Sequence, residues 1–554
     1  MKKIIFCIVL AGLTLAGCKE WLDINHDPNN ATKDRVSMGL FLPQCQTRIA
    51  ALLNNSSNQY FLSHHLTKSG GVGGGFPFLN GLIQTQNADG FWQELYTIGS
   101  NLVIVRDKAI EVNSKAFTGI AQVLLVHNFQ RLVDMFGDIP YTEAIKGIDP
   151  YQPVYDKAQD VYASLLSDLD EAIANLTAAK SAEQRLISTT YELAKFDVMA
   201  KGDMDKWIRF AYSLKLRMLM RVSGVQNVNS QVAALVNNCL TPNEVMFANP
   251  GYIKESGKMS PFYVNFGFSQ TNAEVNGHAY YRPSKEFVEK LRDNKDPRLR
   301  VYVQPRLNLG ADENGRANYE KWGLLNEYYI GIPYGQQDPP LDPRTSSIGL
   351  GILGLAGNMT AGPISNAPVM AGFEVQFYLA EAALNGIISG GDAAARAYYE
   401  AGVKGCFAYL EVPLKEAFTP GNGIPNHYVG VRPPITGTAL QAATEYLAQD
   451  NDFCNWSLMT TTAQKLEAIA TQKWISLFGV NPIEAWSEFR RLDLPFLGSS
   501  IQGQDAKNIS ILLYPQSEFD YNKEHTPNDG RSVYTSLLFW DKANGNTPRA
   551  SDYL

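Results

Sequence analysis

Long apolar runs are absent from the sequence beyond residue 17. A helix that crosses a bilayer needs about 20 mostly apolar residues, and no such stretch follows the first seventeen. This absence argues against a membrane-spanning helix in the rest of the chain. What remains has the composition of a globular protein, because hydrophobic residues make up 45% of the sequence and charged residues only 19%.

Cysteine is also scarce, with six residues in the whole chain. Two of them, Cys7 and Cys18, lie in or beside the N-terminal apolar segment. The other four are Cys45, Cys239, Cys406 and Cys454. Their wide spacing does not support a zinc site or a CxxC redox site. One or two disulfides and isolated buried thiols both stay open as interpretations.

The motifs of several common enzyme classes are missing. The sequence contains no HExxH, no GxSxG, no P-loop and no Rossmann glycine pattern. We therefore expect a protein that is not an enzyme and that uses no cofactor. Two carboxylates for glycoside hydrolysis would meet only in the folded chain, so a glycoside hydrolase stays a remote alternative.

A cluster of basic residues is missing as well. The formal net charge is −7 at pH 7, and its charges are spread along the chain. Nucleic acid is therefore not an expected partner. The seven histidines are scattered, and the adjacent His64 and His65 would point apart on a helix, so no metal site is predicted from them.

The N-terminus has the pattern of a secretory leader. Lys2 and Lys3 precede an apolar run that ends in small residues, and this run is too short to cross a bilayer. The segment Leu15-Ala16-Gly17-Cys18 resembles the lipobox of bacterial lipoproteins. We predict that residues 1–17 are a signal peptide and that Cys18 carries the acyl chains, palmitate among them. An ordinary soluble periplasmic protein is the alternative.

Residues 18–34 are predicted to form the lipid anchor and an extended polar lead-in, because turn-forming residues are frequent there. Oxygen-bearing side chains alternate in this segment with a spacing close to that of a calcium loop. They are Asp23, Asn25, Asp27, Asn29 and Asp34. Pro28 stands where such a loop needs glycine, and its last ligand would not be glutamate. Asx-turns are therefore the favoured interpretation, and no metal is assigned.

Apolar residues recur at helical spacing in two long parts of the chain. Between Tyr155 and Leu176 they fall three or four positions apart, with acidic residues on the other face, which predicts an amphipathic helix. Similar periodicity predicts helices at 116–136, 191–222, 373–384, 393–409 and 462–478. Gly137 and Gly224 follow two of these segments, where glycine permits a left-handed cap. We expect the helices to pack as antiparallel pairs.

The stretches between the helical parts differ in composition. Residues 238–371 are rich in glycine, proline and aromatic residues, which predicts loops, short strands and a few helices, and residues 413–440 and 496–554 are similar. We therefore predict a single body at 35–554. Its helical scaffold covers about 35–237 and 372–495, and loop-rich insertions cover about 238–371 and 413–440. No internal repeat of fixed length is present.

Short segments of distinctive sequence are spread along the chain. They are Trp21-Leu22-Asp23-Ile24-Asn25 with Asp27-Pro28-Asn29, Phe136–Tyr141, Lys206-Trp207 with Ser213–Arg217, Arg282-Pro283-Ser284 with Asp296–Leu299, Ala380–Ala383, Gln472–Ile475 with Glu484-Ala485-Trp486, and Leu513–Glu518. We call these the signature segments. In this order and with this coverage, they resemble the SusD/RagB family of nutrient-binding outer-membrane lipoproteins.

The resemblance implies a fold, a location and a partner. The fold would be mostly α-helical, with tetratricopeptide-like helix pairs as a scaffold (an α-α superhelix) and irregular insertions as a ligand face. The protein would be held in the outer membrane by its lipid, facing the cell surface, beside a SusC-like TonB-dependent transporter. The tryptophan, glycine and tyrosine spacing of tetratricopeptide repeats is not found, so helix pairing rests on the resemblance and on amphipathic periodicity.

Two aromatic stretches are the candidate ligand site. Sugar rings bind through their apolar faces on aromatic rings, while their hydroxyls need polar partners. The glycine-rich stretch 70–80 offers Phe76, Phe78 and Asn80, because its glycines do not suit a helix or strand interior. The second stretch runs from about 280 to 334 and offers Tyr280, Tyr281, Arg282, Tyr319 and Trp322. For each ring taken alone, packing in the core is the competing interpretation.

These residues leave three hypotheses for the function. The first is binding of an oligosaccharide, which an arc of aromatic and amide groups favours. The second is binding of a peptide, which needs backbone hydrogen bonds and side-chain pockets. The third is a structural lipoprotein without a ligand.

The lipobox generates a direct prediction. The Cys18→Ala variant should leave the membrane fraction, since stable anchoring requires two or more acyl chains. Immunoblots of fractionated cells would measure this. A variant that stays with the membranes would show that something other than the lipid holds the protein there.

Overall fold

The structure is a computed structural model, and it describes residues 38–54, 57–73, 75–144, 152–304, 329–336, 345–354, 362–411, 437–498 and 508–541. Most of these residues are helical, and the few strands are short. The predicted leader, Cys18 and the calcium-like segment lie outside the described residues. No helix among the described residues is both long enough and apolar enough to cross a membrane.

The first half of the described chain contains most of the long helices. Its elements are α2 (Met38–Asn54), α3 (Ser57–Leu62), β1 (Leu66–Lys68), α4 (Pro77–Asn80), α5 (Asp89–Glu111), α6 (Lys115–Phe136), α7 (Ala158–Ala178), α8 (Ala182–Thr190), α9 (Leu193–Phe196), α10 (Met204–Val222) and α11 (Asn229–Leu235).

The second half begins with short elements and returns to long helices. Its elements are β2 (Val245–Ala248), α12 (Pro261–Phe266), α13 (Asn276–Tyr280), β3 (Tyr281–Pro283), α14 (Lys285–Asp293), α15 (Leu299–Tyr302), β4 (Val303–Gln304), β5 (Ser347–Ile348), β6 (Ala367–Ala371), α16 (Gly372–Leu384), α17 (Gly391–Leu410), α18 (Ala439–Leu447), α19 (Thr462–Ser476), α20 (Pro482–Leu492) and α21 (Gln516–Tyr521).

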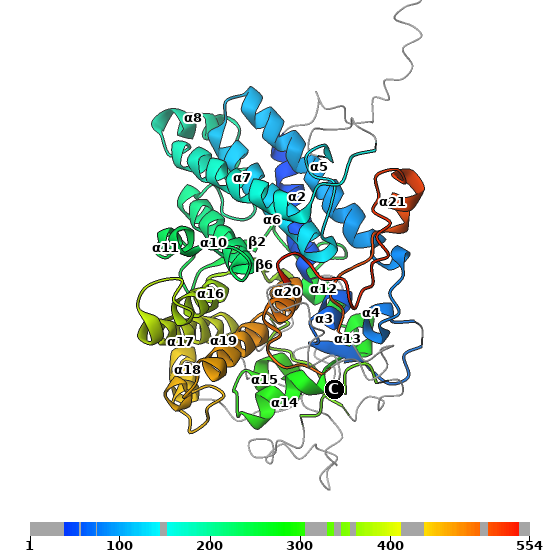
Figure 1. The fold of residues 1–554 in the computed structure, drawn as a ribbon, viewed down its shortest axis with the longest axis vertical. Coiled ribbons are helices and arrows are strands. Elements are labelled where there is room, and N and C mark those ends of the chain that lie inside the picture. Colours follow the sequence, from blue (N-terminus) through cyan, green and yellow to red (C-terminus); the bar gives the residue numbers. More distant parts are fainter. Residues whose placement is uncertain are drawn as a thin grey trace, which may run out of the picture.

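The long helices stack in layers along the long axis of the molecule. Figure 1 shows α5 to α8 at one end, followed by α10 and α11, then α16 and α17, and finally α18 and α19. Helices that follow one another pack as pairs, most extensively α16 with α17 and α6 with α7. The short helices α3, α4, α12 and α13 lie on the other side of this stack. The predicted scaffold of tetratricopeptide-like helix pairs with irregular insertions is confirmed.

Local sequence explains where the predicted helices begin and end. The helix predicted at 116–136 is α6, and Gly137 ends it with a φ of 79° that residues with a side chain rarely adopt. In α7 the buried positions include Val161, Leu165 and Leu169, which share one face. The predictions at 373–384, 393–409 and 462–478 are confirmed as α16, α17 and α19.

The prediction of one helix at 191–222 is wrong, because the chain turns between α9 and α10. The Asp197 carboxylate accepts hydrogen bonds from the backbone N–H groups of Met199, Ala200 and Gly202, which fold the segment back on itself. Asp203 then caps α10. The left-handed cap predicted at Gly224 is wrong as well, since its φ is not positive.

Charged side chains that are buried join helices far apart in the sequence. Arg221 of α10 makes ion pairs with Glu484 and Glu488 of α20, the second at 2.5 Å. Its guanidinium also lies 3.5 Å from the carboxylate of Asp134 of α6. Because an unpaired buried charge is strongly unfavourable, each of these helices needs the others in place.

Glu488 is the acceptor shared by three cations in this region. Besides Arg221, it pairs with Lys473 of α19 and with Arg491, the latter at 2.7 Å. Burial alone would raise the pKa of Glu488, but Arg491, Lys473 and Arg221 hold that pKa well below its ordinary value of 4.5. We use the name ionic cluster for Asp134, Arg217, Arg221, Glu374, Glu381, Lys473, Glu484, Glu488 and Arg491.

The signature segments supply much of this ionic cluster and of the core around it. Four of its members, Arg217, Glu381, Lys473 and Glu484, come from them. The segments also supply the buried tryptophans Trp207, Trp474 and Trp486. Most of the resemblance therefore reflects the scaffold and not the ligand site.

Removing the shared acceptor should destabilise the protein strongly. We expect Glu488→Gln to lower the free energy of unfolding by about 3–5 kcal/mol, because it leaves buried cations without their partner. Urea denaturation would measure the loss. The control is Glu255→Gln, which breaks an exposed pair with Lys258 and should cost no more than about 1 kcal/mol. Equal losses in both variants would contradict the importance of the ionic cluster.

The stability that Glu488 contributes should also depend on pH. Its folded pKa is lowered, so its contribution is fully present above its ordinary value of 4.5 and is lost as the pH falls toward the folded pKa. The difference in unfolding free energy between the wild type and Glu488→Gln should therefore shrink below about pH 4.5. A difference that stays constant down to the acid unfolding transition would contradict this assignment.

Candidate functional site

A short antiparallel sheet brings together the two aromatic stretches nominated from the sequence. Strand β1 follows α3 after residues 63–65, and strand β3 follows α13 directly. In their register Lys68 faces Tyr281 and Thr67 faces Arg282. The backbone N–H of Ser69 extends the pairing by donating to the carbonyl oxygen of Tyr280 at 2.7 Å. The glycine-rich loop after β1 therefore starts beside the second aromatic stretch.

A buried phenylalanine connects the rings of the two stretches. The ring of Phe61 meets Phe76 edge-on at 6.1 Å between centroids, and it meets Tyr281 edge-on at 5.5 Å. Such edge-to-face arrangements fix the orientation of rings. The ammonium of Lys68 lies 5.8 Å from the centroid of Phe76, which is a cation–π distance. We use the name aromatic patch for Lys68, Phe76, Asn80, Tyr280 and Tyr281.

The members of the aromatic patch are accessible to different degrees. Tyr280 is 39% exposed, and the other four are half-buried. The side-chain oxygen of Asn80 is buried and has no hydrogen-bond partner among the described residues, so it does not face a ligand in this structure. Aromatic faces, an ammonium, phenol hydroxyls and the amide N–H groups of Asn80 therefore lie together near the surface, where they can stack on a ligand and hydrogen-bond to it.

Two of the nominated residues are buried beneath the aromatic patch. Phe78 is only 2% exposed, and its ring packs edge-on against Phe91 at 6.2 Å. Arg282 is 1% exposed and donates to the carbonyl oxygen of His278 at 2.7 Å. In this structure both residues support the backbone of the site and do not present a side chain to solvent. Tyr319 and Trp322 lie outside the described residues.

The sequence analysis did not single out Phe61 or Lys68. Phe61 lies in the short helix α3, and Lys68 lies in a three-residue strand. Both residues lie outside the two nominated stretches, Lys68 only two residues before Gly70. The pairing of β1 with β3 is what makes both residues part of the site, and a strand of three residues leaves no readable periodicity.

The region behind the aromatic patch is held by stacked rings. His64 stacks on Tyr334 at 3.9 Å and His65 stacks on Trp474 at 4.6 Å. The hydroxyl of Tyr334 donates to the carbonyl oxygen of Phe61 at 2.7 Å. The expected helical placement of His64 and His65 is wrong, because α3 ends at Leu62 and His64 has a φ of 59°. Burial lowers the pKa of His65 to about 3, so it stays neutral.

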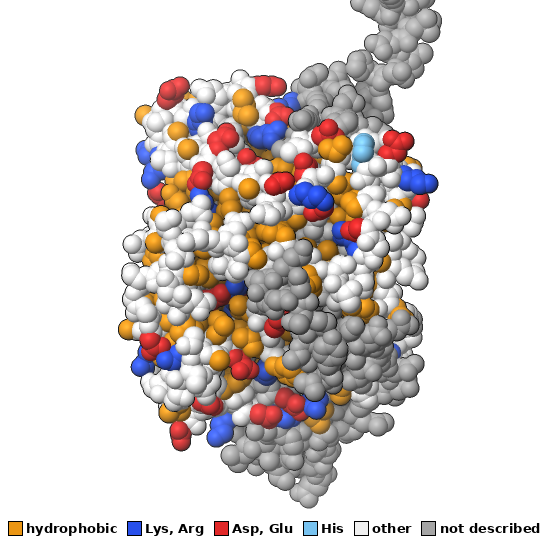
Figure 2. Space-filling view, in the orientation of Figure 1, with side chains coloured by type: hydrophobic (Ala, Val, Ile, Leu, Met, Phe, Trp, Pro, Cys, Tyr) orange, Lys and Arg blue, Asp and Glu red, His pale blue; other side chains and the backbone are white. Residues whose placement is uncertain are grey.

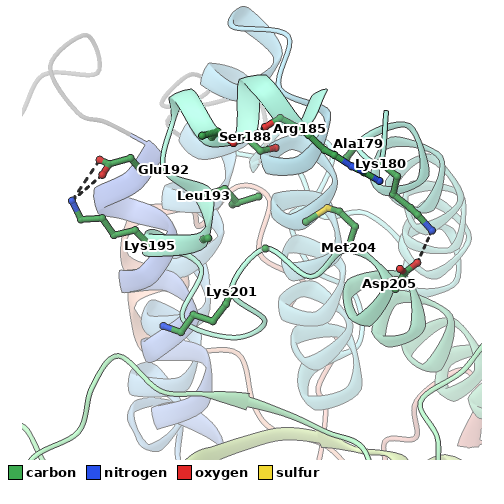
Figure 3. A pocket seen from close by; sticks show the side chains of 13 residues that line it. Ala179, Lys180, Arg185, Ser188, Glu192, Leu193, Lys195, Lys201, Met204 and Asp205 are labelled. Atoms are coloured by element: carbon green, nitrogen blue, oxygen red, sulfur yellow. Dashed lines mark hydrogen bonds and ion pairs between the residues drawn. The ribbon is translucent and has the colours of Figure 1, made fainter. Parts of the chain in front are cut away.

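A pocket of about 610 Å³ lies elsewhere, between α8, α9 and the start of α10. Figure 3 shows two ion pairs at its rim, Lys180 with Asp205 at 2.6 Å and Lys195 with Glu192 at 3.2 Å. No aromatic side chain lines it. It therefore lacks the rings on which a sugar would stack, and the aromatic patch is the better candidate for a ligand site.

The four remaining cysteines are buried free thiols. Burial raises the pKa of Cys45, Cys239 and Cys454 to about 12, which keeps these thiols protonated and unreactive. The sequence left disulfides and isolated thiols open, and the structure has isolated thiols at these four positions. Among the described residues, no group of three His, Cys, Asp or Glu side chains could hold a metal ion.

Charges of both signs are interspersed on one face of the molecule. On the face shown in Figure 2, Lys and Arg side chains lie beside Asp and Glu side chains over most of the described residues. Exposed pairs such as Lys258 with Glu255 belong to this pattern.

Several solved structures share the fold over nearly their whole length. A SusD homologue from Bacteroides fragilis is 20% identical, with a TM-score of 0.67, over 91% of this chain and 99% of that chain. A SusD/RagB family protein from Bacteroides thetaiotaomicron is 20% identical, with a TM-score of 0.68, over 91% and 99%. A chitin-binding SusD homologue from Flavobacterium johnsoniae is 20% identical, with a TM-score of 0.62, over 91% and 98%.

Sequence comparison identifies the family directly. No curated protein matches the chain. A family model described as SusD-like, starch-binding and associating with the outer membrane matches residues 29–515. This range includes most of the signature segments and the whole aromatic patch. The predicted resemblance is confirmed, and the protein belongs to the SusD-like family.

Proposed function

We propose that the protein binds an oligosaccharide at the aromatic patch and delivers it to a SusC-like TonB-dependent transporter in the outer membrane. In this proposal it is a lipoprotein, anchored through Cys18 and facing the cell surface. The observation that carries the proposal is the pairing of β1 with β3, which joins Phe76 and Tyr281 through Phe61.

The chemistry of the aromatic patch suits a sugar. The apolar faces of Phe76, Tyr280 and Tyr281 would cover the C–H faces of pyranose rings. Lys68 and the side-chain N–H groups of Asn80 would donate to the sugar hydroxyls, because the side-chain oxygen of Asn80 is buried. Phe78 and Arg282 would act indirectly, by holding the backbone on which these groups stand.

The relatives support a glycan more than other nutrients. The family description names starch, and the Flavobacterium johnsoniae homologue binds chitin. Both are polymers of pyranose rings. The transporter partner, the cell-surface location and the oligosaccharide specificity rest on the family and on the signature segments. Tyr319 and Trp322 keep the role proposed for them from the sequence.

A peptide is the second candidate ligand. The loop after β1 has open space around Gly73 and Gly75, where an added side-chain carbon would contact nothing within 4 Å. Its backbone groups could therefore pair with an extended peptide. A glycoside hydrolase is a weaker candidate, since the aromatic patch contains no carboxylate. We propose a binding protein without catalytic activity.

Calorimetry would test the proposal on the protein lacking residues 1–18. We expect saturable binding of malto- or chito-oligosaccharides and no release of shorter products on incubation. Binding of peptides alone would overturn the glycan assignment. Cleavage of the oligosaccharide would overturn the assignment as a binding protein.

Single substitutions would locate the site. Tyr280→Ala should raise the Kd for the oligosaccharide by about tenfold or more, because burying an aromatic ring against a ligand contributes about 1.5–3 kcal/mol. The matched control is Tyr191→Ala, which removes a tyrosine that is 38% exposed beside the α8–α9 segment and should leave the Kd unchanged. Equal Kd values for the two variants would place the site elsewhere.

A further inference from the structure

One buried arginine has no negative partner in the described chain. Arg131 of α6 is 4% exposed, and its Nε and one of its terminal nitrogens have no hydrogen-bond partner. No ion pair joins it to any carboxylate of the described residues. An arginine side chain keeps its positive charge at neutral pH. An unpaired charge at such a place is strongly unfavourable, so the protein should supply a counter-charge.

A histidine one turn earlier on α6 is in the same situation. His127 is completely buried, and neither ring nitrogen has a hydrogen-bond partner. Residues four positions apart lie on one face of a helix, so His127 and Arg131 face the same neighbour. Burial, together with Arg131 and Arg217, lowers the pKa of His127 well below its ordinary value. The ring is therefore neutral and offers one N–H donor.

The neighbour on that face is α10. The ring of His127 lies 6.0 Å from that of Phe210, and the carboxylate of Asp134 lies 3.5 Å from Arg221. These contacts occur in the same order along both helices, so α6 and α10 run in the same direction. Arg217 stands between the two contacts on α10, as Arg131 does on α6.

Arg217 adds a second positive charge with a free edge. Its Nε and Nη2 edge is occupied by Glu374, at 2.9 and 2.7 Å, and Glu484 lies 3.7 Å from the same edge. Its Nη1 is buried and has no hydrogen-bond partner. Burial, together with Arg217, lowers the pKa of Arg131 to about 9, which leaves Arg131 charged at pH 7. Among the described residues, no carboxylate compensates the positive charge of Arg131.

Asp134, another acidic residue of this region, has partners other than Arg131. The carboxylate of Asp134 accepts from Tyr162 at 2.6 Å, from Trp540 at 3.0 Å and from Gln130 at 2.7 Å. Its ion pair is with Arg221. These bonds fix Asp134 toward Arg221, and none of them involves Arg131.

We propose that Arg131, His127 and Arg217 enclose a binding site for a small monovalent anion, a halide such as chloride. The anion would accept from the free N–H groups of the two guanidinium groups and of the imidazole. It would replace the missing carboxylate beside Arg131. The burial of all three side chains favours a single atom over a sulfate or phosphate group, which is larger and carries more charge.

The dependence of the unfolding equilibrium on bromide concentration would test this site on the whole mature protein. In urea, at constant ionic strength, sodium bromide would replace sodium gluconate, whose anion is too large to enter. Above the Kd of the site, each tenfold rise in bromide should lower the unfolding equilibrium constant about tenfold. An unchanged unfolding midpoint would overturn the proposal.

Two variants separate this site from general salt effects. Arg131→Met should remove the dependence on bromide. Arg209→Met is the matched control on α10, since Arg209 is half-buried and already paired with Glu244 at 2.6 Å, and it should keep the dependence. The same bromide dependence in both variants would overturn the site.

Diffraction keeps the proposal testable if Arg131→Met does not fold. Wild-type crystals grown in bromide should show an anomalous peak between Arg131, His127 and Arg217. Ordered water alone at this place, or a peak only on the protein surface, would overturn the proposal.

Discussion

The pairing of buried charges across helices is the constraint on which the rest of this structure depends. Glu488 joins cations from α10, α19 and α20, and Arg221 reaches back to Asp134 of α6. Removing one member leaves a buried charge alone, which is more costly than never burying the pair. The ionic cluster therefore specifies how the helix layers stack, because any other arrangement would separate its charges.

The residues that hold the scaffold together are different from those of the aromatic patch. This difference explains why the sequence identifies the family more readily than the ligand. The signature segments carry residues such as Lys473 and Glu484, whose partners lie in other helices. The aromatic patch instead depends on a three-residue strand and on one buried ring, Phe61. A scaffold shared at about 20% identity can therefore hold different ligand faces.

The sequence predicted the long helices well, because their apolar period repeats over several turns. The prediction of one helix at 191–222 was wrong because the Asp197 carboxylate folds the backbone between α9 and α10. A single polar side chain leaves no periodic signal in the sequence. For the site, glycine and aromatic content pointed to two stretches that the pairing of β1 with β3 brings together. The sequence could not show that Phe76 is half-buried and Phe78 buried, because this difference in exposure arises only when the loop packs against α5.

The sheet of β1 and β3 has a consequence for how such proteins diversify. Its strands are joined through backbone N–H and carbonyl groups, which are the same for nearly every amino acid. Side chains at positions 68 and 281 can therefore be exchanged while the two strands stay paired, and the ionic cluster is not touched. In the function proposed above, a few substitutions at these positions would change the ligand that is bound and keep the stability of the whole protein.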